Sequence, residues 1–167
     1  MGLDMYLYKV THINAEWEGG NLLIDINIEN IKQGKRYEFN INKISSISEE
    51  IGYWRKANQI HNWFVKNIQD NVDNCAYYYV STSALIELRN KCLEALKYKD
   101  RVLNEELSEE ELEKFEEILP TQGGFFFGNT AYSYDYFSQI EDTIDILEDI
   151  DKYADNYNIS FMYSSSW

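Results

Sequence analysis

The residues best suited to chemistry lie in one stretch, Gly52 to Phe64, which holds two of the four tryptophans, one of the two histidines and two adjacent cations. Arg55 and Lys56 could pair with a phosphate or a carboxylate, and Trp54 could stack on a planar ring. His61 adds an imidazole. These are the parts of a site for an anionic ligand that carries a ring. The competing interpretation is that the aromatic and imidazole rings are core residues and that the cations pair with acidic side chains.

Four further residues are candidates for the same site. Gln59 could form hydrogen bonds with the ligand, and Tyr78 is an alternative to Trp54 for stacking. Thr121 and Gln122 precede two glycines, whose backbone N–H groups are approachable to an anion because they carry no Cβ. We expect this loop to form a second wall of the pocket.

Motifs that would define a reaction are missing from the sequence. It contains no glycine-rich phosphate loop of the Walker or dinucleotide type and no nucleophile signature. Cys75 and Cys92, with His12 and His61, are too few to supply a metal site readily, so we expect two reduced thiols, no metal and no cofactor. An enzyme that acts on a nucleotide through His61 stays open as one alternative.

The charge is unevenly distributed along the chain. The net charge is −14; residues 1–99 carry 12 acidic and 12 basic side chains, whereas residues 100–167 carry 17 acidic and 3 basic ones. Because binding to phosphate backbones requires Lys and Arg, this distribution predicts no direct nucleic-acid binding. It suits a basic partner, although solvated acidic helix faces that keep the protein in solution are the simpler explanation.

Three strands are predicted near the amino terminus. Leu3 to Val10 and Leu22 to Ile28 alternate between apolar and polar residues, and Tyr37, Phe39 and Ile41 form the apolar face of a third segment. Short connections between successive strands favour an antiparallel arrangement.

From about Ser48 to Ile68 the apolar spacing changes to three and four residues, which predicts an amphipathic helix. Its buried face includes Trp54 and His61. The residues expected across from that face are Arg55, Gln59, Asn62 and Lys66. In this arrangement Trp54 and His61 would line the floor of a pocket, and Arg55 would reach in from its rim.

The remainder alternates between helices and short strands. Tyr77 to Val80 is a predicted β segment, and Ser81 or Thr82 can cap the helix that follows. Ser108 and Glu111 form a capping-box pattern at the start of an acidic helix that ends before Pro120. Another helix is predicted to begin at Ser133 or Asp135, and Ile159, Phe161 and Tyr163 alternate in a last strand.

These elements predict a single α+β domain over residues 1–167. Its antiparallel sheet would combine the amino-terminal strands with the carboxy-terminal strand, covered by three main helices. No apolar run approaches the roughly 20 residues that span a bilayer, and Met1 to Asp4 lacks a basic leader, so we expect no membrane contact and no export. A homo-oligomer stays open.

Four blocks of the sequence together resemble a family of small proteins found in tailed phages and prophages. The blocks are Met1 to Leu7, Tyr53 to Phe64, Leu119 to Thr121 with Phe125 to Gly128, and Ser165 to Trp167. The family carries no agreed activity, so the resemblance implies no catalytic role. It implies a phage or prophage accessory protein in the host bacterial cytoplasm, where counter-defence is a common function.

Two functions of different kinds follow as hypotheses. The first is capture of a nucleotide or nucleotide-derived defence signal, with Arg55 and Lys56 on the phosphate and Trp54 or Tyr78 on the ring. The second is inhibition of a basic host defence protein, such as a CRISPR effector or nuclease, by acidic helices that mimic nucleic acid. The helices concerned would be Glu109 to Glu117 and Asp135 to Asp155.

Overall fold

The computed structural model describes residues 2–13, 29–30, 35–36 and 43–167. Its main sheet has four strands in the order β4-β1-β6-β5, and every neighbouring pair is antiparallel. These strands are β1 (Asp4–His12), β4 (Ser46–Arg55), β5 (Tyr78–Val80) and β6 (Ile159–Ser166). A separate two-stranded ladder pairs β2 (Glu29–Asn30) with β3 (Lys35–Arg36).

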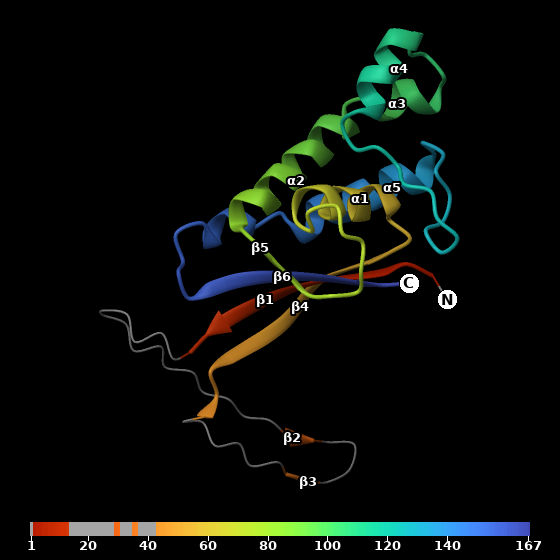
Figure 1. Cartoon of the computed structure of the whole chain (residues 1–167). Coiled ribbons are helices and arrows are strands. Elements are labelled where there is room, and N and C mark those ends of the chain that lie inside the picture. The colour runs from red at the N-terminus through yellow and green to blue at the C-terminus, as the bar shows by residue number, and fades with distance from the viewer. Residues whose placement is uncertain (1, 14–28, 31–34, 37–42) are drawn as a thin grey trace.

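Helices cover one face of the main sheet. They are α1 (Asn58–Asn67), α2 (Thr82–Leu96), α3 (Lys99–Leu103), α4 (Glu109–Glu116) and α5 (Tyr134–Ile146), with a short 3-10 helix at Ile150–Tyr153. Figure 1 shows α1, α2 and α5 over the sheet, whereas α3 and α4 extend beyond the far end of α2. The predicted α+β class, with amino-terminal and carboxy-terminal strands in one sheet, is therefore confirmed.

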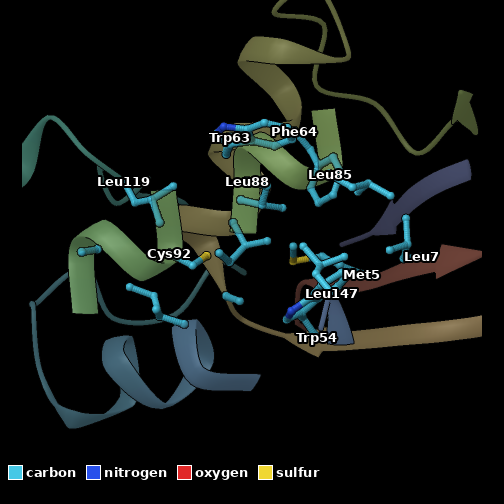
Figure 2. Close-up of a cluster of buried hydrophobic side chains, with 14 of the residues drawn as sticks. Met5, Leu7, Trp54, Trp63, Phe64, Leu85, Leu88, Cys92, Leu119 and Leu147 are labelled. Carbon is cyan, nitrogen blue, oxygen red and sulfur yellow. The ribbon is translucent and has the colours of Figure 1, made fainter. Parts of the chain in front are cut away.

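The core lies between the sheet and these helices. Met5 and Leu7 of β1 point into it, and Tyr163, which pairs with Leu7 across β6, is also buried. Figure 2 shows Trp54 of β4 beside Met5 and Leu147, with Leu85 and Leu88 of α2 facing them. Burying a large apolar side chain stabilises a protein by about 1.5–3 kcal/mol, so this contiguous cluster is the main source of stability.

The helix boundaries follow the caps seen in the sequence. Ser81 Oγ accepts a hydrogen bond from the Ala84 amide at 3.2 Å and so caps α2. Ser108 and Glu111 form the predicted capping box at the start of α4. Helix α5 begins directly after Ser133, which was one of its two predicted starts.

The opposite face of the sheet carries a row of tyrosines. The ring centroids of Tyr6 and Tyr53 lie 5.4 Å apart, and those of Tyr6 and Tyr8 lie 6.3 Å apart. No helix lies over this face in the described part of the chain (Figure 1). Tyr53 is 45% exposed at the end of the row, next to Arg55.

The prediction of one helix from Ser48 to Ile68 is wrong in its first half. Ser46–Arg55 forms strand β4, and the helix starts only at Asn58. Pairing with β1 over its whole length satisfies the backbone groups of β4, and this outweighs the local helical spacing. The chain leaves the strand at Lys56, which has a left-handed backbone with φ of 59°.

Two other predictions lie outside the described residues. The strand predicted for Leu22 to Ile28 falls there, as do the alternating positions of Tyr37, Phe39 and Ile41. Among the helices that the structure does describe, none has the length and apolar composition needed to cross a membrane.

Candidate functional site

Helix α1 is buried along most of its length although it is rich in polar residues. Asn58, Gln59, His61 and Asn62 are each at most 7% exposed. The prediction that Gln59 and Asn62 face the solvent is therefore wrong. Buried polar groups cost free energy unless they are hydrogen-bonded, and each of these four side chains has partners.

Asn58 and Asn62 hold the loop between α4 and α5 against α1. Asn58 Nδ2 donates to the carbonyl oxygens of Phe127 and Asn129 at 3.2 and 2.8 Å, and its Oδ1 accepts from the Gln122 amide at 3.0 Å. Asn62 Nδ2 donates to the Pro120 carbonyl at 2.9 Å. The amide side chains of α1 thus fix the path of the loop.

The predicted binding residues Thr121 and Gln122 belong to this fastened loop. Thr121 Oγ1 donates to the Thr130 carbonyl at 3.1 Å, which closes the loop on itself. The Gln122 amide is committed to Asn58. Neither residue lines either of the two hollows described below.

His61 is the centre of a second group of polar contacts, the His61 cluster, made of the buried His61 and Tyr163 and the more exposed Asp73 and Trp167. His61 is fully buried, with Nδ1 2.8 Å from the Tyr163 hydroxyl and Nε2 3.1 Å from Asp73 Oδ1. The Trp167 indole N–H donates to the same carboxylate oxygen at 3.3 Å. Asp73 therefore ties the carboxy-terminal residue of the chain to helix α1.

The protonation of His61 follows from these partners. Burial lowers the pKa of His61 below its ordinary value of 6.5, although the nearby Asp73 carboxylate opposes this effect. A neutral imidazole has one donor and one acceptor, and an ionised carboxylate can only accept. Nε2–H therefore donates to Asp73, and Nδ1 accepts from the Tyr163 hydroxyl. Both ring nitrogens are engaged away from solvent, so His61 offers no exposed group for acid–base chemistry on a ligand.

Neither aromatic residue predicted to stack on a ligand is placed for that role beside Arg55. Trp54 is 3% exposed, and its indole N–H donates to Thr143 Oγ1 of α5 at 2.9 Å. Tyr78 lies on β5, at the opposite edge of the sheet from β4, and its hydroxyl donates to Asn74 Oδ1.

Arg55, Lys56 and Gln59 do come together, in a groove between the end of β4 and the first turns of α5. We call it the Arg55 groove. It consists of two adjoining open hollows of about 340 Å³ each, which share Arg55, Asp135 and Gln139. The first is also lined by Lys56, Gln59, Gly128, Asn129, Ala131, Ser133 and Tyr136. The second is also lined by Tyr53, Trp54, Ser138 and Asp142.

Lys56 packs closely against Gly128, which also lines the first hollow of the groove. Gly128 has φ of 90°, and a Cβ at this position would lie 3.1 Å from the Cβ of Lys56. The Lys56 amide donates to the Leu3 carbonyl at 2.8 Å. Glycine at 128 is therefore needed for both its conformation and the close approach of Lys56.

The charges of the groove are only partly satisfied by the protein. The Arg55 side chain is 60% exposed and lies 3.8 Å from Asp4 Oδ1, which also accepts a short hydrogen bond of 2.6 Å from the Tyr53 hydroxyl. Within the ranges that the structure describes, neither Lys56 nor Asp135 forms an ion pair. Two cations and a carboxylate therefore face the same open space.

The sequence had not singled out the remaining groove residues as a site. Asp135, Gln139 and Asp142 are spaced by four and three residues along α5, so they lie on one face of the helix. The sequence shows that spacing, but it does not show that this face meets the end of β4. Tyr53 lies in the stretch from Gly52 to Phe64, but the predicted helix did not place its side chain beside a ligand.

The described residues contain no group of three or more His, Cys, Asp or Glu side chains placed to hold one metal ion. Cys75 is exposed and Cys92 is buried, and both are free thiols. Burial raises the pKa of the Cys92 thiol to about 12, so Cys92 is an unreactive core residue.

No family model, curated protein or solved structure matches the chain. The chemistry of the Arg55 groove is therefore the basis for a functional proposal.

Proposed function

We propose that the protein binds a small anionic ligand of the nucleotide type in the Arg55 groove. The observation that carries this proposal is the meeting of Arg55, Lys56 and the exposed ring of Tyr53 around two adjoining hollows. Each hollow, at about 340 Å³, has a volume at the lower end of the range for small-molecule sites. With the resemblance to phage proteins, such binding would serve counter-defence by capture of a nucleotide-type signal in the host bacterial cytoplasm.

The first hollow suits the anionic end of the ligand. Lys56 supplies an ammonium and Arg55 a planar guanidinium, which can form two parallel hydrogen bonds with a phosphate. Ser133 stands directly before α5 and its side chain makes no capping hydrogen bond to that helix. The first amides of α5 therefore add donors and a partial positive charge at the same end.

The second hollow suits the ring. Tyr53 replaces Trp54 and Tyr78 as the stacking residue in this proposal, because it lines the hollow and remains 45% exposed. Its hydroxyl is fixed by Asp4, which holds the ring in place beside Arg55. A ring already held in its binding orientation loses less conformational entropy when a ligand binds.

Capture is favoured over turnover by the state of His61. A general base must reach a proton of the ligand directly or through one water. His61 is fully buried, engages both ring nitrogens and does not line the groove. The proposal therefore assigns His61 a structural role in the core.

Calorimetric titration with nucleoside mono-, di- and triphosphates and cyclic dinucleotides tests the proposal. The wild-type protein should bind at least one of them, and a double variant Arg55→Gln, Lys56→Gln should weaken that binding by about a hundredfold, since two charged contacts are lost. Lys66→Gln is the matched control, because Lys66 is exposed on α1 outside the groove. Absence of binding to every member of the panel by the wild type would refute the proposal.

A second function is favoured by a different observation at the other end of the molecule. The segment that contains α4 extends beyond α2 (Figure 1). It carries exposed carboxylates at Glu105, Glu106, Glu109, Glu110, Glu113 and Glu117. This segment fits inhibition of a basic host defence protein by mimicry of nucleic acid, with association that weakens as salt screens the charges.

Pull-down from host lysate separates the two functions. A nucleic-acid mimic should retain a basic protein at low salt and release it at high salt, and reversal of Glu109 and Glu113 to lysine should abolish retention. Capture of a small molecule alone should leave no protein bound, and it should not respond to these two substitutions.

A further inference from the structure

The Arg55 groove contains carboxylates as well as cations, and this limits what its ligand can be. Asp135 lines both hollows and Asp142 lines the second one. A ligand that is anionic throughout would be repelled by these groups. The ligand must therefore have an anionic end for Arg55 and Lys56 and an end that donates hydrogen bonds to a carboxylate.

Gln59 determines which atoms of Gln139 are available to that ligand. Gln59 Nε2 donates to the Tyr136 carbonyl at 3.3 Å and to Gln139 Oε1 at 3.0 Å. Because the Tyr136 carbonyl can only accept, the group of Gln59 that contacts it must be the amide nitrogen. The Gln139 atom that accepts from the same nitrogen must then be the amide oxygen. This leaves the amide nitrogen of Gln139 as a hydrogen-bond donor in a residue that lines both hollows.

Asp135 and Gln139 then form an ordered pair on α5. They are four residues apart on the helix, which places their Cβ atoms about 5–6 Å from one another on the same face. The pair therefore offers a charged acceptor and, one helical turn further on, a neutral donor. Within the described residues Asp135 forms no ion pair.

From this arrangement we infer that the groove selects guanine nucleotides, an inference that rests on the proposed function. The edge of guanine presents two adjacent donors, N1–H and the 2-amino group, and next to them the O6 acceptor. The two carboxylate oxygens of Asp135 accept from the two donors, and the Gln139 amide donates to O6. The ring lies on Tyr53, and the phosphate extends towards Arg55 and Lys56.

Other bases match the pair less well. Adenine has one amino donor on this edge and no second donor for the carboxylate. Hypoxanthine keeps N1–H and O6 but has no 2-amino group. Uracil places carbonyl oxygens on both sides of its single N–H, and these face the negative charge of Asp135. The expected order of affinity is therefore guanine, then hypoxanthine and adenine, then uracil.

The test is calorimetric titration of the full chain with GMP, IMP, AMP and UMP. The wild type should bind GMP at least about tenfold more tightly than AMP, because a hydrogen bond to a charged acceptor is lost with adenine. Equal affinity for GMP and AMP would overturn the inference while leaving the proposed function standing. Failure of all four to bind, with failure of the wider nucleotide panel, would remove both.

The variant Asp135→Asn distinguishes two roles of Asp135 by whether its affinity for GMP falls or rises. If Asp135 accepts hydrogen bonds from guanine, the variant should bind GMP at least about tenfold more weakly and should lose its preference for GMP over AMP. If Asp135 only repels the phosphate, the variant should bind GMP and AMP more tightly by the same factor, which would overturn the inference.

Asp145→Asn is the matched control, because Asp145 is exposed on α5 and lines neither hollow. It removes the same charge from the same helix and should leave the ratio of GMP to AMP affinity unchanged. Gln139→Glu provides an independent check, since replacing the donor amide by a carboxylate should weaken GMP binding while AMP binding changes less. Thermal unfolding of each variant shows that it is folded at the temperature of the titration.

Discussion

The His61 cluster and the Arg55 groove have opposite properties, although His61 and Arg55 lie only six positions apart in the sequence. In the cluster a polar ring is fully buried and both of its nitrogens have partners. In the groove the charges of Lys56 and Asp135 are left without ion pairs among the described residues. A polar residue that the protein itself satisfies stabilises the fold, whereas one left unsatisfied at the surface is available to a ligand.

The burial of the chain changes at Lys56, between strand β4 and helix α1. Before it, alternation along β4 turns Trp54 into the core and Arg55 outwards. After it, α1 runs between the sheet and the loop before α5, so that every residue from 58 to 65 is buried. The left-handed backbone of Lys56 changes the chain direction between the two elements.

Removal of the His61 side chain should give the largest effect. His61→Ala leaves a cavity and removes the partners of the buried Tyr163 hydroxyl and of Asp73, so the free energy of unfolding should fall by about 3–5 kcal/mol. Urea denaturation measures this change. His12→Ala is the control, because His12 is exposed and its ring forms a hydrogen bond at the surface, with the Ser160 hydroxyl. If His61→Ala lowered the free energy of unfolding by less than about 1 kcal/mol, the His61 cluster would not be a source of stability.

Asn58→Ala should have the second largest effect. It removes three hydrogen bonds that hold the loop before α5 and leaves buried backbone groups without partners, which should cost about 2–4 kcal/mol. The matched control is Asn67→Ala, because Asn67 is exposed and its side chain donates to the Trp63 carbonyl one turn earlier in the same helix. Equal losses for the two variants, measured by urea denaturation, would contradict the role given to Asn58.

The pH dependence of the free energy of unfolding should reveal the buried state of His61. Because burial depresses the pKa of His61, the folded protein binds fewer protons at this residue than the unfolded chain does below about pH 6.5. The stability from neutral His61 is present above pH 6.5 and is lost as the pH falls towards the folded pKa. The free energy of unfolding should therefore decrease less between pH 7.5 and 5.5 in His61→Gln than in the wild type. An identical decrease in both proteins would show that His61 does not titrate in this way.

Arg55→Gln should have the smallest effect on stability. Arg55 is exposed and its contact with Asp4 is a long surface pair, so the free energy of unfolding should change by no more than about 0.5 kcal/mol. Binding of the nucleotide ligand should nevertheless weaken by about tenfold or more. A variant that loses stability in urea denaturation but keeps its affinity would assign Arg55 to the fold and not to the groove.

Much of the fold was predictable because its signals are local. The alternation of Leu3 to Val10, the cap at Ser81 and the capping box at Ser108 each depend on neighbours within a few residues, and each appears in the structure. Strand β4 was missed because its conformation is decided by pairing with β1, which the local spacing of Trp54, Ala57 and His61 does not report.

The site was predictable only in part. Arg55, Lys56 and Gln59 were singled out from residue type alone, because cationic and amide side chains in one stretch with two tryptophans suit a site for an anionic ligand with a ring. Asp135 and Gln139 could not, because the meeting of α5 with the end of β4 is a tertiary contact between segments far apart in sequence, as the hydrogen bond from Trp54 to Thr143, 89 residues further on, shows.

The position of β6 in the sheet has a consequence for how the protein is made. Strand β1 lies between β4 and β6, and its pairing with β6 joins residues 4–11 to residues 159–166. At synthesis rates of about 5–20 residues per second, β1 waits roughly 7–30 seconds on the ribosome for its second neighbour. During that interval Met5 and Leu7 lack their partners on β6, Ser165 and Tyr163. We expect chaperones to contact nascent chains that end before residue 159, and release to coincide with emergence of β6.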